Sequence, residues 1–382
     1  MHTIIIGSGM AGITLARELR KLDKTRELTI VTADDGSYYA KPNLSNAFAG
    51  GKTAASLVMA PPEKLRQELD INFRTQCPVA RIDADRHCIV TPAGELHYDQ
   101  LVLAVGASQI PLNLAGHSSD IVSVNSLDDY AALRCRLEGK RRVAIIGAGL
   151  IGCEFANDLR LGHFEVDLYD LASRPLERLL PTSASSRLHA KLSEIGVGFR
   201  LGTGLDAIQR DGDSLVLIDS RGQTERYDVV LSAIGLRPNV SLAKTAKLAT
   251  HLGILTDATL QTSAPDIYAL GDCIELDGQY LPYVLPIMHC AKKLALTLTG
   301  RPEKIDLPAM PIVVKTPACP TVIAPPAQSD AEWQMESDDD GLRALCIDVA
   351  SGELQGFVLQ GCYTRERMAL TARLPKPVIF KN

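Results

Sequence analysis

Glycines with a spacing suited to phosphate binding occur twice in this chain. The first set is Gly7-Ser8-Gly9-Met10-Ala11-Gly12, and the second is Gly147-Ala148-Gly149-Leu150-Ile151-Gly152. In such a run the first glycine permits a tight turn, the second lets the backbone approach a pyrophosphate, and the third lets a helix pack against a strand. Short apolar runs, Ile4–Ile6 and Val143–Ile146, precede the two sets, and helical patterns follow them. One set alone could be an ordinary glycine-rich turn, but two in this context predict two dinucleotide sites, which we call the first and second cradles.

Acidic residues that could bind ribose hydroxyls follow each cradle. Asp170 ends the strand after the second cradle, where such an acid is expected. After the first cradle the acid is displaced by two positions, so Asp34 is the candidate and Thr32 could share its role. A carboxylate at Asp170 would accept a hydrogen bond from a 2'-hydroxyl and repel a 2'-phosphate, which favours NADH over NADPH. Arg174 weakens this inference, because an arginine there could pair with a 2'-phosphate.

Two further polar residues stand where backbone geometry directs them. Lys41 precedes Pro42, which disfavours helical geometry at the lysine and fixes its direction. Asp272 follows Gly271 at the end of a short predicted strand and suits a chain of sugar-like hydroxyls. The alternatives are a solvated surface lysine and a turn or helix-capping aspartate. A helix is expected to begin near Pro286, with its N-terminal dipole open to a ligand.

The elements around the cradles also repeat. A buried strand containing Ala104 and ending at Gly106 has a counterpart ending at Gly235, and a Tyr-Asp pair precedes each strand. We therefore predict an α/β fold with two Rossmann-like dinucleotide-binding domains. The first comprises residues 1–109 and 241–308, and the second comprises residues 110–240. Residues 309–382 form a small C-terminal α+β domain with strands at 342–349 and 354–359 and a final helix at 364–374.

Composition limits the other classes of function. Of 382 residues 46% are hydrophobic and 22% are charged, with a net charge of -5 that gives no reason to expect nucleic acid as a partner. No apolar run is long enough to span a membrane. The nine cysteines contain no closely spaced pair, so a redox-active dithiol is not expected, and the eight histidines lack metal-ligand spacing. Reduced thiols favour a cytoplasmic location.

The ordered set GSGMAG, LVLAVGA, GAGLIGCE, LSAIGLRPN and IYALGDC resembles the two-dinucleotide-binding flavoprotein pyridine nucleotide reductases over the whole chain. The resemblance implies tightly bound, non-covalent FAD on the first cradle, with Asp272 near its ribityl and phosphate groups, and NADH as substrate on the second. Without a dithiol, the chain is expected to pass a hydride from NADH to flavin N5 and to release electrons singly to an iron or iron-sulfur protein.

The segments TADDGSYYAKPNLS, GQYLPYVLPI and LPAMPIVVKTPACP further resemble the rubredoxin reductase branch of this family and, slightly less closely, the flavorubredoxin reductases. This implies NADH:rubredoxin oxidoreductase activity in a rubredoxin-dependent chain such as alkane hydroxylation. The alternatives are a flavorubredoxin or ferredoxin reductase, a flavin oxidase, or a non-catalytic FAD/NADH redox sensor. We expect a monomer.

The resemblance also implies roles for individual residues. It places Lys41 near the flavin ring and Glu154 where nicotinamide meets flavin, so that the two would orient each other; a helix-terminal acid is the alternative for Glu154. Lys315 would bring positive charge to the flavin, Val79 would contact adenine through its backbone, and Val284 would lie near the pyrimidine side. Basic residues that could dock an acidic carrier are Lys41, Lys292, Lys293, Arg365 and Arg367.

Overall fold

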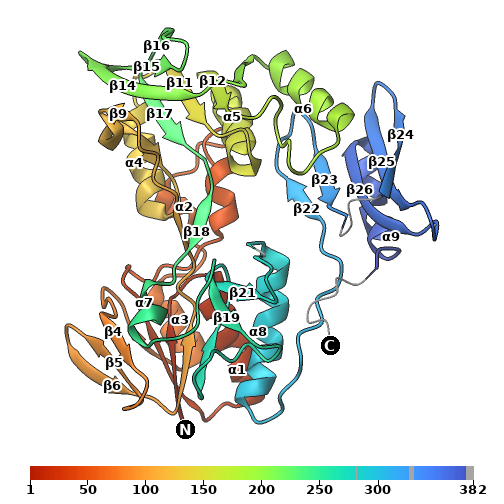
Figure 1. Ribbon diagram of the computed structural model, residues 1–382. Coiled ribbons are helices and arrows are strands. Elements are labelled where there is room, and N and C mark those ends of the chain that lie inside the picture. The colour runs from red at the N-terminus through yellow and green to blue at the C-terminus, as the bar shows by residue number, and fades with distance from the viewer. Residues whose placement is uncertain (281, 327–330, 376–382) are drawn as a thin grey trace.

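The computed structural model describes residues 1–280, 282–326 and 331–375. Figure 1 shows three parts: a lower one that contains helices α1 and α8, an upper one that contains α4 and α5, and a set of C-terminal strands to the side. The chain passes from the lower to the upper part and back before it reaches the C-terminal strands. None of the helices in the described residues is long and apolar enough to cross a bilayer.

The lower part is built on a parallel sheet with the strand order β20-β7-β1-β2-β3. Its strands are β1 (His2–Ile6), β2 (Glu27–Val31), β3 (Asn72–Arg74), β7 (Gln100–Leu103) and β20 (Ile267–Ala269). Apart from β3, they are short, largely apolar runs with little alternation, as expected for strands covered on both faces. Helices pack around this sheet: α1 (Met10–Leu22), α3 (Pro62–Leu69) and α8 (Val284–Leu298). Helix α8 begins two residues before the expected start, because Pro286 is accommodated in its first turn, where the missing N–H has no intrahelical partner to lose.

The upper part repeats this plan with the parallel order β10-β17-β11-β12-β13. Its strands are β10 (Val122–Ser123), β11 (Arg142–Ile146), β12 (Glu165–Asp170), β13 (Val197–Leu201) and β17 (Val229–Ser232), and its helices are α4 (Leu127–Leu137), α5 (Leu150–Leu161) and α6 (Thr182–Glu194). The two Tyr-Asp pairs have the same function. Asp99 accepts the first N–H of β1 from His2, and Asp228 accepts the N–H groups of Arg141 and Arg142 at the start of β11.

Smaller elements complete these two parts. Antiparallel strands cross between them, β8 (Ala107–Gln109) pairing with β18 (Leu236–Pro238). The remaining elements are β4 (Arg81–Asp83), β5 (Cys88–Thr91), β6 (Gly94–His97), β9 (Ala115–Gly116), β14 (Leu205–Asp211), β15 (Ser214–Asp219), β16 (Thr224–Tyr227), β19 (Ile254–Thr256), β21 (Ile274–Leu276), α2 (Ala54–Leu57), α7 (Ser241–Thr245), and the 3-10 turns η1 (Lys41–Asn46) and η2 (Ser118–Asp120).

The C-terminal strands form an antiparallel sheet of order β22-β23-β26-β25-β24. Its elements are β22 (Ile312–Val314), β23 (Thr321–Ala324), β24 (Ala331–Ser337), β25 (Gly341–Asp348), β26 (Leu354–Gly361), η3 (Cys362–Glu366) and α9 (Arg367–Thr371). Only β25 and β26 were expected from the sequence. The expected helix at 364–374 is wrong in extent, because its first residues form the 3-10 turn η3 and the α-helix ends at Thr371.

Candidate functional site

The first cradle joins β1 to α1, and its glycines are required for different reasons. A Cβ on Gly7 would lie 2.2 Å from the carbonyl oxygen of Ala104, and one on Gly12 would lie 2.0 Å from that of Gly7. Gly9 differs, since a Cβ there would meet no protein atom within 4 Å, and its φ of -68° suits any residue. Protein packing therefore explains Gly7 and Gly12 but not Gly9, whereas close approach of a pyrophosphate would explain it.

Asp34 reaches the first cradle despite its displacement from the strand end. Its Oδ1 accepts hydrogen bonds from Ser8 Oγ (3.1 Å) and Thr32 Oγ1 (2.6 Å), and also from the N–H of Gly36 (3.0 Å). Gly36 has a φ of +79°, which a side chain would disfavour, and its turn directs the carboxylate back to the cradle. Thr32 and Asp34 thus act as a connected pair beside Ser8. Val79 is half-buried, just beyond Cys77, whose N–H donates to Thr32 O.

Asp272 lies against the same cradle through its neighbour Gly271. A Cβ on Gly271 would be 2.8 Å from Ala11 Cβ, so the Gly-Asp turn touches the first turn of α1. Burial raises the pKa of the Asp272 carboxyl group, and the charge of Lys41 opposes this shift. Its buried Oδ1 has no hydrogen-bond partner within the described chain. A buried acceptor needs a donor, and a ligand hydroxyl would supply one, so the glycine at position 9 and this carboxylate both fit an FAD.

Lys41 is the first residue of η1 and is exposed to solvent. Its Nζ is 3.3 Å from Asn125 Oδ1. Desolvation lowers the pKa of the ammonium group, while Asp272 and Asp34 act in the opposite direction. The negative charges of both acids of the first cradle therefore act on the Lys41 ammonium group and favour its charged form.

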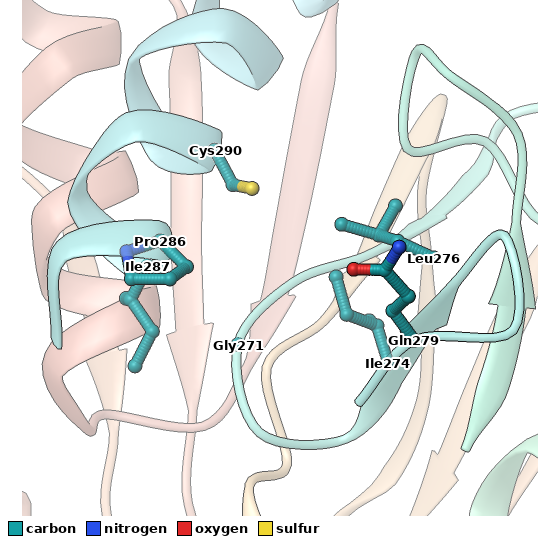
Figure 2. Close-up of a pocket in the computed structure, with 7 residues that line it drawn as sticks. All are labelled: Gly271, Ile274, Leu276, Gln279, Pro286, Ile287 and Cys290. Atoms are coloured by element: carbon teal, nitrogen blue, oxygen red, sulfur yellow. The ribbon is translucent and has the colours of Figure 1, made fainter. Parts of the chain in front are cut away.

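A small pocket of about 10 Å³ adjoins Gly271. Figure 2 shows Pro286, Ile287 and Cys290 of α8 on one side, with Ile274, Leu276 and Gln279 on the other. Burial raises the pKa of the Cys290 thiol to about 12, so this thiol stays protonated and acts as an apolar wall. Val284 is exposed in the first turn of α8, outside the residues that line this pocket.

The second cradle repeats the glycine geometry of the first. Gly147 has a φ of +110°, and a Cβ on Gly152 would lie 1.7 Å from Gly147 O, while one on Gly149 would meet nothing within 4 Å. Asp170 is anchored by the N–H groups of Ala148 (2.5 Å) and Ala172 (2.7 Å), one to each carboxylate oxygen. Its remaining acceptor capacity is available to a ribose hydroxyl.

Several predicted residues frame the cradles. Ala104 directly follows β7 and is buried, and Gly106 follows it with a φ of +65°. Gly235 holds the matching position after β17, with a φ of +115°. In the first turn of α5, Ile151 is exposed and Leu150 is partly buried. These residues surround the two turns from the sheet side and the helix side.

Glu154 is bound to Lys315, not to Lys41, so the expected mutual orientation of Lys41 and Glu154 is wrong. The Lys315 ammonium lies 2.9 Å from Glu154 Oε2, and the Lys315 N–H donates to Oε1 (3.0 Å). Ser45 Oγ donates to the same carboxylate (2.5 Å), and Lys315 Nζ also donates to the carbonyl oxygen of Pro42. The positive charge of Lys315 is thus balanced by a carboxylate that is only 3% exposed. The helix-terminal alternative is also wrong, because the first turn of α5 contains no acid.

One of the expected docking charges is already paired. Lys293 lies 2.6 Å from Glu303 and 3.4 Å from Asp306, so it does not present an isolated positive charge. Lys292, Arg365 and Arg367 are exposed. The nine cysteines are all free, and none of the described residues form a cluster suited to a metal ion.

The comparisons with known proteins cover the whole chain. The family model for pyridine nucleotide-disulphide oxidoreductases matches residues 1–300. The chain belongs to this family. A second model, for the rubredoxin binding C-terminal domain, matches residues 304–374. FAD and NADH are therefore the cofactors of this oxidoreductase.

Individual members of the family give a consistent picture. A rubredoxin-NAD(+) reductase of Alcanivorax borkumensis is 46% identical, covering 98% of this chain and 99% of that protein. A nitric oxide reductase FlRd-NAD(+) reductase of Aeromonas hydrophila is 41% identical, covering 98% and 96%. The crystal structure of a ferredoxin reductase from Rhodopseudomonas palustris is 27% identical with a TM-score of 0.88, covering 99% and 96%. The predicted fold class and the family resemblance are confirmed.

Sequence reasoning missed several polar residues that hold the site together. Asn125 accepts from Lys41 and donates to Ala107 O (2.8 Å). In α5, Asn157 accepts the N–H of Ala318 (3.0 Å), and Asp158 accepts those of Phe48 (2.7 Å) and Ala49 (3.2 Å). Polar residues within the buried, largely apolar part of α5 are a signal that could have identified Asn157 and Asp158.

Proposed function

We propose that the chain is an FAD-dependent NADH:rubredoxin oxidoreductase, with FAD held on the first cradle, NADH on the second and rubredoxin docked against the C-terminal domain. The observation that carries this assignment is that three separate segments of the chain meet at the Glu154 carboxylate. This residue stands on the helix of the second cradle, and its carboxylate binds Ser45 from η1 and Lys315 from the C-terminal segment. The near-full-length similarity to a rubredoxin-NAD(+) reductase supports it.

The residues of the chain would act mainly by binding and positioning. When bound, FAD supplies the redox chemistry, since it can accept a hydride from NADH and pass electrons on singly. Gly9 leaves room for the pyrophosphate, and Asp34 and Asp272 accept hydrogen bonds from hydroxyl groups. Lys41 presents positive charge on which both of these acids act. On the second cradle Asp170 orients the adenosine ribose of NADH. The proposed division into residues 1–109 with 241–308, 110–240 and 309–382 gives each ligand its own domain.

Lys315 and Glu154 would fix the place where the two ligands meet. Both of their charged groups are already hydrogen-bonded, so neither needs to move when a ligand binds. Together with Ser45 they fill space between η1, α5 and the C-terminal segment and limit the entry of water. This favours transfer between bound partners over loss to solvent.

The test begins with anaerobic addition of NADH to the purified yellow protein, followed by rapid mixing with candidate acceptors. We expect prompt bleaching of the flavin band and fast reoxidation by rubredoxin, with ferredoxin and oxygen much slower. Flavorubredoxin is the second candidate acceptor, because a flavorubredoxin reductase is 41% identical to this chain. Rapid reoxidation by oxygen alone would instead indicate an oxidase, and failure with every protein carrier would refute electron transfer to a carrier.

The docking face can be tested separately from NADH oxidation. Arg365 and Arg367 are exposed on the C-terminal domain, so reversing their charge should weaken the reduction of an acidic carrier and reduce its salt dependence. Reduction by NADH should be unchanged, because Arg365 in η3 and Arg367 in α9 belong neither to the cradles nor to the Glu154–Lys315 junction. We also propose a cytoplasmic location, which the nine free cysteines support.

A further inference from the structure

The loop that follows β12 is tied at both ends to one residue of the second cradle. Ala148 donates its N–H to Asp170 Oδ2 (2.5 Å), and its carbonyl oxygen accepts the N–H of Leu176 (2.9 Å). The intervening residues, 171–175, therefore lie beside the cradle next to the ribose acid. Ser173 and Arg174 belong to this loop, and they are the residue types that commonly bind a phosphate.

Both of these residues are already engaged by one acid, Glu177. Its Oε1 lies 3.4 Å from Arg174 Nη1 and accepts the hydroxyl of Ser173 (3.0 Å), and its Oε2 accepts the Ser173 N–H (3.3 Å). Arg174 is nevertheless incompletely paired, because its buried Nε has no hydrogen-bond partner among the described residues. An anionic group that reached this loop could therefore be bound by Arg174 if Glu177 did not compete.

We propose that Glu177 determines dinucleotide specificity by occupying Arg174 and Ser173, which would otherwise bind the 2'-phosphate of NADPH. This inference rests on the proposed function, because it requires the second cradle to bind the dinucleotide substrate. Asp170 and Glu177 then act in different ways. Asp170 accepts a hydrogen bond from the 2'-hydroxyl of NADH and repels a 2'-phosphate. Glu177 binds Arg174 and Ser173, so these two residues are not free to bind the phosphate and offset that repulsion.

The expected effect follows from the charges in the loop. A phosphate monoester carries about -1.5 to -2 charges at neutral pH, so a nearby carboxylate repels it strongly. Glu177→Gln removes one carboxylate charge and frees the Arg174 guanidinium, which can then make a charge-assisted hydrogen bond to the phosphate. Since Asp170 remains, NADH stays the preferred substrate, but its advantage over NADPH should shrink about tenfold.

Direct binding provides the main measurement, because it does not depend on flavin turnover. The FAD-loaded wild-type protein and the variant Glu177→Gln are titrated calorimetrically with NAD+ and with NADP+, and the ratio of the two dissociation constants is compared. The ratio should move about tenfold toward NADP+ in the variant. The double variant Arg174→Gln/Glu177→Gln should lose this gain. Arg178→Gln, the adjacent exposed residue, serves as the matched control and should leave the ratio within about twofold of the wild type.

A kinetic measurement should agree with the binding. With ferricyanide as acceptor, Glu177→Gln should lower the KM for NADPH, with a smaller change in kcat. The proposal is refuted if Glu177→Gln changes the affinities for NAD+ and NADP+ by the same factor, or if the gain for NADP+ survives the loss of Arg174. Thermal unfolding of each variant excludes a general loss of structure, and Glu177→Ser provides a second route to the same test. A wild-type protein that failed to bind NAD+ would refute the proposed function instead.

Discussion

The pairing of Glu154 with Lys315 makes a quantitative prediction. Glu154 Oε2 receives three side-chain donors, Lys315 Nζ (2.9 Å), Ser45 Oγ (2.5 Å) and Asn46 Nδ2 (3.3 Å), and Oε1 receives the Lys315 N–H (3.0 Å). Glu154→Gln preserves the shape of the side chain but offers only one acceptor oxygen. That oxygen will face the three donors, which leaves the new amide N–H group against the backbone N–H of Lys315.

The cost can be estimated from burial. Removing one member of a buried ion pair costs about 3–5 kcal/mol when both charges are enclosed. Glu154 is 3% exposed, but the Lys315 side chain is 32% exposed and can recover some hydration. The loss of one charge-assisted backbone hydrogen bond contributes about 1.5–3 kcal/mol. Because these contributions overlap, Glu154→Gln should destabilise the folded protein by about 3 kcal/mol.

A double-mutant cycle isolates the pair. Urea unfolding of the FAD-loaded protein is followed by circular dichroism for the wild type, Glu154→Gln, Lys315→Met and the double variant. The double variant should be more stable than the sum of the single effects predicts, by about 1–2 kcal/mol, because each single change leaves an unpaired charge or an unused acceptor. Lys292→Met, an exposed lysine of α8, is the control and should change stability by less than about 0.5 kcal/mol.

Two results would refute this reasoning. If the single effects of Glu154→Gln and Lys315→Met simply add, the two side chains do not interact in solution as they do in the structure. If Glu154→Gln costs less than about 0.5 kcal/mol, the carboxylate is hydrated and the junction is open. Either result would also remove the support that this junction gives to the proposed meeting place of the two ligands.

Three other predictions concern single side chains. Gly9→Ala adds a methyl group that meets no protein atom within 4 Å, so the polypeptide should fold normally but retain FAD at least about tenfold less tightly, as measured by flavin content after dialysis. Asp170→Ala should raise the KM for NADH at least about tenfold while slowing hydride transfer at saturation much less, and stopped-flow reduction separates the two. Burial raises the pKa of Asp158, and the N–H groups of Phe48 and Ala49 only partly offset this. Its stabilising contribution is complete below the unfolded pKa of about 4 and is lost as the pH rises through the folded pKa, so urea midpoints should shift in favour of Asp158→Asn as the pH is raised above about 4.

The cradles could be predicted from the sequence because their requirements are local. Gly7 and Gly12 are needed by the same turn in which they occur, since their missing side chains make room for Ala104 O and Gly7 O. The Asp34 prediction was less direct. Its displacement from the strand end is compensated by the turn at Gly36, whose positive φ can be guessed from a glycine but whose direction cannot.

The junction at Glu154 could not be predicted in the same way. Its backbone partner Lys315 is 161 residues away, and Ser45 is 109 residues away on the other side. No periodicity or spacing relates residues at such separations, and family resemblance suggested Lys41 as the partner because both residues are near the expected flavin. In the structure Lys41 instead donates a hydrogen bond to Asn125, and Glu154 forms an ion pair with Lys315.

Helix α5 explains why these distant segments meet. It begins at the second cradle, and three of its buried polar residues bind backbone N–H groups from elsewhere: Glu154 binds Lys315, Asn157 binds Ala318, and Asp158 binds Phe48 and Ala49. The first two fix the C-terminal segment, and the third fixes the chain that follows η1. Each of these side chains binds different backbone N–H groups, so removing one of them leaves its N–H groups without that acceptor. One helix thereby sets the position of the second cradle relative to both η1 and the rubredoxin-binding domain, as the proposed direct electron route requires.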